Sequence, residues 1–203
     1  MCGVVAIYAY RSDAPPVEGA ELEAIRDHMI PRGPDGAGSW ISSNGRIGLA
    51  HRRLSIIDLS TAAAQPMAFG DGRYQITYNG EIYNFRALRA ELEAKGQVFK
   101  TKSDTEVLLH LYHLYGTDMV GHLRGMYAFT IWDEAKRGLF LARDPFGIKP
   151  IYYADTGGTL RAASTVKALR AGGKVGTGVN PAGHVGFFLF GYVPEPHTLF
   201  QDI

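Results

Sequence analysis

The chain has 203 residues, and its 21 Lys and Arg against 20 Asp and Glu give a formal net charge of +1. Charge this even, with no block of one sign, excludes the basic surfaces that attract nucleic acid or an anionic membrane. A single cysteine excludes an internal disulfide and a cysteine-rich zinc site, and favours a reducing, cytoplasmic setting. The longest apolar stretch, residues 185–193, is far shorter than the ~20 residues of a membrane-spanning helix, so we expect a soluble protein.

The apolar pattern changes between strand and helix several times, which predicts one domain of mixed α and β structure. An apolar run without polar alternation predicts a buried strand over residues 2–10. Apolar residues at helical spacing predict helices over 18–29, 84–95 and 104–115, and Gly96 and Gly116 end the second and third. Antiparallel strands are predicted at 127–133, 138–144, 150–155 and 159–164, the last two joined by a turn at 156–158. Asn180 and Pro181 predict the start of a final helix.

The only cysteine stands directly after the initiator methionine. Removal of Met1 would give Cys2 a free α-amine, whose pKa of about 7.7–8.0 suits a base that takes the thiol proton during attack on a carbonyl carbon. Gly3, with no side chain, is expected to leave room for a substrate. The alternative is that Cys2 is a small apolar residue at the start of a buried strand.

Asn79 and Gly80 follow the strand-like segment YQITY. An Asn-Gly pair after a strand indicates a turn, yet the Asn side-chain amide and the Gly N–H also provide two donors for the oxyanion of a tetrahedral intermediate. Arg53 precedes the apolar segment 54–57, for which we expect a strand. Its planar guanidinium suits a substrate carboxylate, although most arginines at strand edges are simply solvated.

Ser103 and Glu106 have the spacing of a capping box, which explains both residues without a ligand. Asp104, between them, suits either the helix dipole or a ligand ammonium. A thiol with its amine, an oxyanion donor pair, an arginine for a carboxylate and an aspartate for an ammonium together describe a site for a free amino acid with a reactive side-chain carbonyl. Glutamine fits this description.

Seven segments in chain order resemble the N-terminal glutaminase domain of the asparagine synthetase family, a class II glutamine amidotransferase. They are MCGVVA, RGPD at 32–35, HRRLSIID, NGEIYN, SDTEVLL, GMYAFTIWD and RDPFGIKPIYY. The resemblance spans nearly the whole chain, so it implies one glutamine amidotransferase domain over residues 1–203. It also implies the α+β N-terminal nucleophile (Ntn) hydrolase fold, a four-layer αββα sandwich of two antiparallel sheets.

The resemblance implies that Cys2 attacks the side-chain amide of L-glutamine, that ammonia leaves, and that water then converts the γ-glutamyl thioester to glutamate. The α-amine of Cys2 would act as base and acid. The residues that match the family's site are Cys2, Asn79 and Gly80 for catalysis, and Arg53, Leu54, Ser55, Ile56, Ile57, Asn79, Gly80, Glu81 and Asp104 for substrate binding. Among these, Arg53 matches the carboxylate-binding residue, and Glu81 and Asp104 match those that face the amino group. Arg32 and Asp35 are expected to brace the site.

The chain departs from the family at Pro31, where a histidine is common, and at Thr165, where a glutamate is usual. It also lacks the ATP-binding loop Ser-Gly-Gly-x-Asp-Ser. The resemblance therefore implies no cofactor and no metal in this domain, with ATP and Mg expected only in a C-terminal synthetase domain, to which residues 180–203 would begin the connection. The departure at Thr165 bears on the contact with that synthetase domain.

The use of the ammonia is open at this point. The simplest acceptor is aspartate, and a sugar or another carboxylate is the alternative. A glutamine-sensing module without turnover is a further hypothesis, but a sensor needs neither the nucleophile Cys2 nor the oxyanion donor Asn79. Expected partners are L-glutamine, the synthetase domain and, as a further candidate, a second copy of the chain; no nucleic acid or membrane partner is expected.

Overall fold

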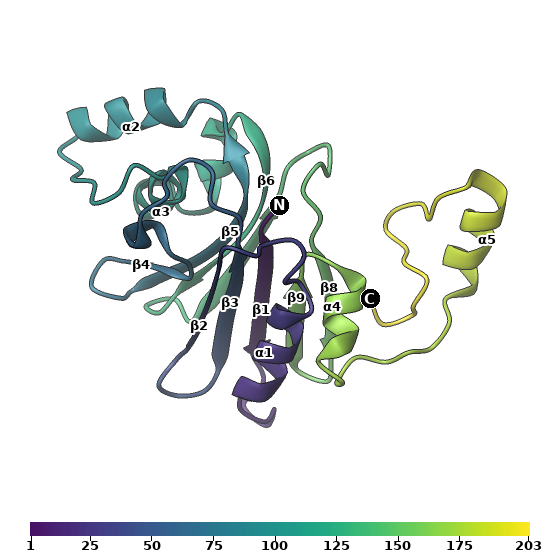
Figure 1. The fold of residues 1–203 in the computed structure, drawn as a ribbon. Coiled ribbons are helices and arrows are strands. Elements are labelled where there is room, and N and C mark those ends of the chain that lie inside the picture. Colours follow the sequence, from purple (N-terminus) through teal and green to yellow (C-terminus); the bar gives the residue numbers. More distant parts are fainter.

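Two antiparallel sheets form the centre of the computed structural model, which describes residues 1–203 (Figure 1). In both sheets every pair of neighbouring strands is antiparallel. The first sheet has the strand order β2 (Gly36–Ile41), β3 (Ile47–Arg53), β1 (Gly3–Ala9), β9 (Thr159–Ala163) and β8 (Tyr152–Thr156). The second has the order β4 (Met67–Phe69), β5 (Tyr74–Ile82), β6 (Gly125–Asp133) and β7 (Gly138–Arg143).

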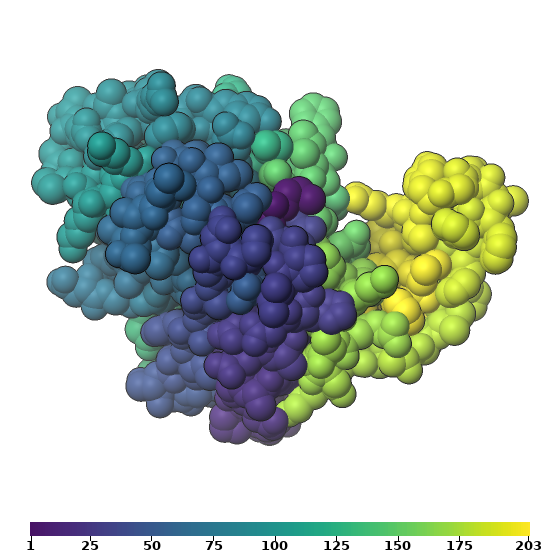
Figure 2. Space-filling model, in the orientation of Figure 1, coloured from purple at the N-terminus to yellow at the C-terminus, as the bar shows by residue number.

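Helices cover the outer face of each sheet (Figure 1). The helices α1 (Gly19–Asp27) and α4 (Val166–Ala171) pack on the first sheet, and α2 (Phe85–Ala94) and α3 (Asp104–Tyr115) lie on the side of the second. Short 3-10 helices occupy Thr61–Ala63 and Gly116–His122. A last helix, α5 (Pro181–Phe190), stands away from the rest of the molecule on an arm formed by the C-terminal residues (Figures 1 and 2).

Three apolar clusters fill the spaces between these layers. The largest joins β5 and β6 to α2 and α3, and a second joins β1 to α1 and α4. The third lies between the sheets, where Ala6 and Leu49 of the first sheet meet Trp132 of the second. Because Val5 and Ile7 face α1 while Ala6 faces the other sheet, β1 is apolar on both sides, which explains its lack of alternation. The layers follow the predicted αββα order.

Local sequence signals predicted most elements. The helix 104–115 has the predicted bounds, and the helices at 18–29 and 84–95 are each shorter by one or two residues at their ends. Gly96 and Gly116 have φ of +84° and +58°, as expected of residues that end helices. The two-residue turn Gly157-Gly158 joins β8 to β9, and both glycines have positive φ.

The last helix also begins as predicted. The Asn180 side chain accepts hydrogen bonds from the N–H groups of Ala182 at 3.1 Å and Gly183 at 3.4 Å, and Pro181 occupies the first turn. Gly191, in the left-handed conformation, ends the helix. None of the helices combines the length and the apolar character that crossing a membrane requires.

A polar pair lies in the otherwise apolar space between the sheets. His51 is fully buried and its Nδ1 lies 3.0 Å from the Thr77 hydroxyl, which donates to the Ala50 carbonyl at 3.1 Å. Because the Thr77 proton is used in that second bond, Nδ1 of His51 is the donor and Nε2 is left without a partner. Burial, reinforced by Arg53 and Arg52, lowers the pKa of His51 from 6.5 to about 3.

This histidine makes stability depend on pH. Between pH 6.5 and about 3 the unfolded chain holds a proton on His51 that the folded protein does not, so the free energy of unfolding falls as the pH falls. We expect His51 to contribute a slope of up to about 1.4 kcal/mol per pH unit in this window. Urea denaturation of the wild type and His51→Gln from pH 7 to pH 4 measures it. The exposed His28→Gln is the control, and equal slopes for wild type and His51→Gln would contradict a neutral His51.

Candidate active site

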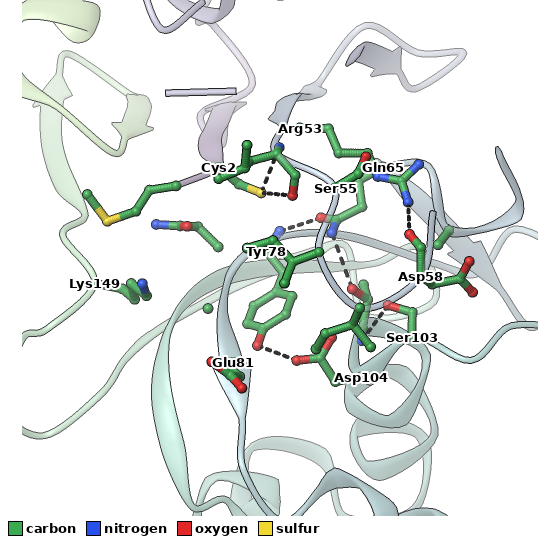
Figure 3. Close-up of a pocket in the computed structure, with 18 of the residues that line it drawn as sticks. Cys2, Arg53, Ser55, Asp58, Gln65, Tyr78, Glu81, Ser103, Asp104 and Lys149 are labelled. Carbon is green, nitrogen blue, oxygen red and sulfur yellow. Dashed lines mark hydrogen bonds between the residues drawn. The ribbon is translucent and has the colours of Figure 1, made fainter. Parts of the chain in front are cut away.

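A pocket of about 180 Å³ lies where the N-terminus meets the ends of β3 and β5 and the start of α3 (Figure 3). The N-terminal residues, dark purple in Figure 2, reach the surface of the molecule. Every residue that the sequence nominates for the site lines this pocket: Cys2, Arg53, Leu54, Ser55, Ile56, Ile57, Asn79, Gly80, Glu81 and Asp104. The structure adds Met1, Asp58, Ala63, Gln65, Tyr78, Ser103, Thr105, Met126 and Lys149.

The Cys2 thiol is half-buried beside the first residue after β3. Its Sγ accepts the N–H of Leu54 at 3.3 Å and lies 3.6 Å from the Leu54 carbonyl oxygen, to which the thiol donates. Burial raises the pKa of the Cys2 thiol, and the Leu54 N–H, the N-terminal ammonium and two arginines, Arg53 and Arg32, oppose the rise. The thiol is therefore mostly protonated at neutral pH and needs a base before it can act as a nucleophile.

The backbone around Cys2 is fixed from two sides. Arg32 Nε donates to the Cys2 carbonyl oxygen at 3.1 Å. A Cβ added to Gly3 would lie 3.0 Å from Cβ of Met29, so the missing side chain allows this chain segment to pack against Met29, which lies just beyond the end of α1. The expectation that Gly3 makes room for a substrate is therefore wrong. Met1 itself lines the pocket.

Residues 54–57 form a loop, which corrects the predicted strand. The strand β3 ends at Arg53, whose guanidinium donates to the carbonyl oxygens of Ser60, at 2.9 Å, and of Asp58. Asp35 accepts the N–H of Ser55 at 2.8 Å. The bond to Ser55 uses a backbone group that a neighbouring strand would otherwise pair, and the two bonds from Arg53 hold the following part of the loop next to the end of β3. Arg53 is thus bound to protein as well as facing the site.

Asn79 and Gly80 lie inside β5, paired with β6, and this corrects the interpretation of the pair as a turn. Asn79 is 2% exposed, and its Nδ2 is buried without a hydrogen-bond partner. A Cβ at Gly80 would overlap the carbonyl oxygen of Met126 and lie 2.6 Å from the Tyr78 ring. The site therefore holds an unused amide donor beside a position that only glycine can occupy.

The start of α3 brings a buried carboxylate to the pocket. Asp104 is 4% exposed, and its Oδ2 accepts the Tyr78 hydroxyl at 2.7 Å and the Ile82 N–H at 3.1 Å (Figure 3). Burial raises the pKa of Asp104, and the Tyr78 hydroxyl and the nearby backbone N–H groups oppose the rise. A carboxylate held in this way can bind a cation inside the pocket.

The predicted capping box is only half formed. The Ser103 hydroxyl accepts the Thr105 N–H at 3.1 Å, as a helix cap does. Glu106 does not reach back to the Ser103 N–H, which instead bonds to the Thr101 hydroxyl at 3.2 Å. The Glu106 carboxylate accepts the N–H groups of Lys100 and Thr101 at 2.8 and 2.7 Å, so it orders the loop before the helix. No three His, Cys, Asp or Glu side chains converge as a metal site would require.

The family model described as a glutamine amidotransferase domain matches residues 1–203. The chain belongs to the glutamine amidotransferase domain family. Over 200 residues it is 40% identical to asparagine synthetase (glutamine-hydrolyzing) 1 of Bacillus subtilis (strain 168), covering 98% of this chain and 31% of that protein. It is 41% identical over 170 residues to asparagine synthetase B (glutamine-hydrolyzing) of Escherichia coli (strain K12), covering 83% and 30%. The resemblance to this family is therefore confirmed.

The glutamine amidotransferase domain spans about a third of the length of these curated relatives. Among solved structures, glutamine phosphoribosylpyrophosphate amidotransferase from B. subtilis matches with a TM-score of 0.69 at 24% identity, covering 85% of this chain and 44% of that chain. At this identity the likeness concerns the fold alone. It agrees with the two antiparallel sheets and their helical layers, and the predicted Ntn-hydrolase fold is confirmed.

Of the two single-residue departures from the family pattern, the structure explains Thr165 and does not explain Pro31. Thr165, where a glutamate is usual, caps α4: its hydroxyl accepts the Ala168 N–H at 3.1 Å. Pro31 is exposed in a turn, and nothing in the structure explains why it replaces a histidine.

Among the residues that the structure adds to the amidotransferase pocket, Gln65, Tyr78 and Lys149 make contacts or have burial that sequence patterns did not indicate. Gln65 accepts the Tyr78 N–H at 2.7 Å and donates to the Thr105 hydroxyl at 3.2 Å, which ties β5 to α3. Lys149 lines the pocket and is only 8% exposed. No sequence pattern pointed to Gln65. Tyr78 directly precedes the family-like segment NGEIYN, and Lys149 lies within RDPFGIKPIYY. The burial of Lys149 is itself unusual, because lysine side chains are rarely buried.

Proposed function

We propose that this domain hydrolyses the side-chain amide of L-glutamine to glutamate and ammonia, with Cys2 as the nucleophile after removal of Met1. The convergence of Cys2, Arg53, Asn79 and Asp104 from four distant segments in one pocket carries the proposal. The pocket supplies a thiol, an unused buried amide donor, a cation and a carboxylate. These groups match a zwitterionic amino acid with a side-chain amide: the cation and the carboxylate pair with its two charges, and the thiol and the amide donor act on its amide group.

The reaction uses groups of the chain alone. The Cys2 α-amine takes the thiol proton as Sγ bonds to the amide carbon, and the same proton passes to the nitrogen that leaves as ammonia. Asn79 Nδ2 and the Gly80 N–H stabilise the oxyanion. Water then attacks the thioester, loses a proton to the amine, and the C–S bond breaks to give glutamate and the free thiol.

The remaining pocket residues bind the substrate. Arg53 holds the α-carboxylate, and Asp104 with Glu81 holds the α-ammonium. Leu54, Ser55, Ile56 and Ile57 form the wall that closes over the substrate chain. The position of Asp104, buried at the helix start, supports the ammonium role because a charged partner there would offset the cost of its burial.

A glutamine analogue with a diazo-ketone side chain is expected to label a preparation beginning at Cys2 once, on Cys2. Sγ of Cys2 would bond to the diazo carbon, the thiol proton would pass to that carbon, and nitrogen gas would leave. Mass spectrometry after digestion identifies the site, with Cys2→Ala as the control and glutamate release from L-glutamine as the parallel assay. L-glutamine should protect and D-glutamine should not. A label elsewhere, or labelling that L-glutamine does not slow, would contradict the site.

We further propose that the ammonia serves an ATP-dependent domain of the asparagine synthetase type, for which residues 180–203 begin the connection. The helix α5 supports this, because Phe188 and Leu189 are 82% and 69% exposed and its only buried residues are Gly183 and Gly186. An apolar helix in water marks a surface that another body covers. A reading frame after codon 203 that encodes Ser-Gly-Gly-x-Asp-Ser supports the proposal, and a stop codon there opposes it. Aspartate is the simplest acceptor, with a sugar or another carboxylate as the alternative.

A further inference from the structure

Tyr78 touches two separate parts of the proposed site. Its hydroxyl donates to Asp104 Oδ2 at 2.7 Å, and its ring covers Gly80, where an added Cβ would lie 2.6 Å from Cε2 of the ring. The side chain is 3% exposed and points across the pocket wall toward the start of α3 (Figure 3). No role in the reaction described above uses this residue.

The two hydrogen bonds that reach the Asp104 carboxylate from β5 fall on the same oxygen. Both the Tyr78 hydroxyl and the Ile82 N–H bond to Oδ2, while Oδ1 accepts neither. Burial, with Asp104 as a further cause, raises the pKa of Tyr78 well above 10, so its hydroxyl stays protonated and donates throughout the neutral range. The N–H groups at the helix start, of Asp104 and Thr105, also act on this carboxylate. Tyr78 therefore helps to hold the carboxylate in one orientation, and Oδ1, which neither the hydroxyl nor the Ile82 N–H reaches, is the oxygen assigned here to a ligand.

The position of Tyr78 is itself set by the frame of the protein. Gln65 accepts the Tyr78 N–H at 2.7 Å and donates to the Thr105 hydroxyl at 3.2 Å, which links the strand that carries Tyr78 to the helix that carries Asp104. The hydroxyl and the carboxylate thus meet across two rigid elements. Such a preorganised contact loses little entropy when a ligand binds.

Two other carboxylates line the pocket, and neither is held in this way. Asp58 is half-buried, and its two oxygens are each used by a backbone N–H group, Oδ1 by Ser60 and Oδ2 by Lys102. Glu81 is exposed and accepts no hydrogen bond from the protein. The charged groups opposite are Arg53 and Lys149. Asp104 is therefore the carboxylate that is both buried and oriented, and Tyr78 is the side chain that orients it.

We propose that Tyr78 is a positioning residue that aims Asp104 at the α-ammonium of the substrate and makes the pocket selective for amides that carry this group. The proposal rests on the proposed function, because it assigns the ammonium to Asp104. Tyr78→Phe removes the hydroxyl and keeps the ring over Gly80, so the fold and the oxyanion donors should persist.

The test compares L-glutamine with 4-carbamoylbutanoate, which is glutamine without its amino group. For Tyr78→Phe we expect KM for glutamine to rise about tenfold with kcat nearly unchanged, as for weakening one charge-assisted contact. The value of kcat/KM for 4-carbamoylbutanoate should not change, so selectivity falls about tenfold. In an Asp104→Asn background, Tyr78→Phe should add no further loss. Tyr112→Phe is the matched control, since this tyrosine is 5% exposed, its hydroxyl has no hydrogen bond to the protein, and it lies outside the pocket.

Calorimetric binding in a Cys2→Ala background separates this inference from the proposed function, because that variant cannot turn over. A tenfold weaker Kd for glutamine with Tyr78→Phe, and not with Tyr112→Phe, supports the positioning role even if the wild type releases no glutamate. Equal losses for glutamine and 4-carbamoylbutanoate, or an unchanged affinity for both, would overturn it. So would a further loss from Tyr78→Phe in the Asp104→Asn background.

Discussion

Protein that retains Met1 will release no measurable glutamate from glutamine, whereas the same protein beginning at Cys2 will. With Met1 in place, the nitrogen of Cys2 is a peptide amide and cannot accept a proton at neutral pH. Burial raises the pKa of the Cys2 thiol, so without a base the thiol stays mostly protonated at neutral pH. Loss of a general base costs about 10²–10⁴ in rate. Met1 also lines the pocket and takes space that the substrate needs, so the two effects add.

The comparison is made on one batch of protein. Expression with methionine aminopeptidase inhibited gives the retained form, and treatment with purified aminopeptidase gives the form that begins at Cys2; intact mass verifies each. Glutamate release is then measured at neutral pH and equal concentration, with Cys2→Ala treated in parallel. If the two forms were equally active, another base would serve Cys2 and the N-terminal nucleophile mechanism would be wrong.

Replacing Asn79 with alanine will lower kcat by about 10²–10³ and leave KM nearly unchanged. The side-chain amide is buried and its Nδ2 has no partner in the protein, so it is a desolvated donor available to a ligand. A donor that strengthens its bond as the oxyanion forms acts on the transition state more than on bound glutamine. Because no hydrogen bond is lost from the resting protein, the fold should survive the substitution.

Thr130→Val is the matched control. Its hydroxyl is also buried without a partner, and the residue lies outside the pocket on the strand next to β5. Steady-state kinetics and thermal melting on both variants separate a loss of turnover from a loss of stability. Thr130→Val should leave kcat unchanged. A change in KM alone for Asn79→Ala, or an equal loss of kcat in the control, would remove Asn79 from the oxyanion site.

The sequence determined those elements whose causes lie within a dozen residues. Apolar spacing and the terminal Ser103 and Gly116 set the bounds of α3, and Asn180 with Pro181 set the start of α5. The unbroken apolar run after Cys2 predicted a strand covered on both faces. The segments that resemble the family identified the pocket residues, but their sequences do not show which hydrogen bonds hold the side chains in place.

Only the tertiary structure decided the geometry of the pocket, because there the interactions between residues far apart in the chain outweigh local preferences. Pairing with β6 overrides the turn preference of Asn79-Gly80, since the ladder satisfies both backbones at once. The N–H groups of Leu54 and Ser55 bond to the Cys2 thiol and the Asp35 carboxylate in place of a neighbouring strand, and no strand forms at 54–57. The bond between Tyr78 and Asp104 spans 26 positions and has no local signature. Local propensity is worth fractions of a kcal/mol per residue, whereas a buried polar group without its partner costs about 1–3 kcal/mol, so satisfying distant partners decides the geometry of the site.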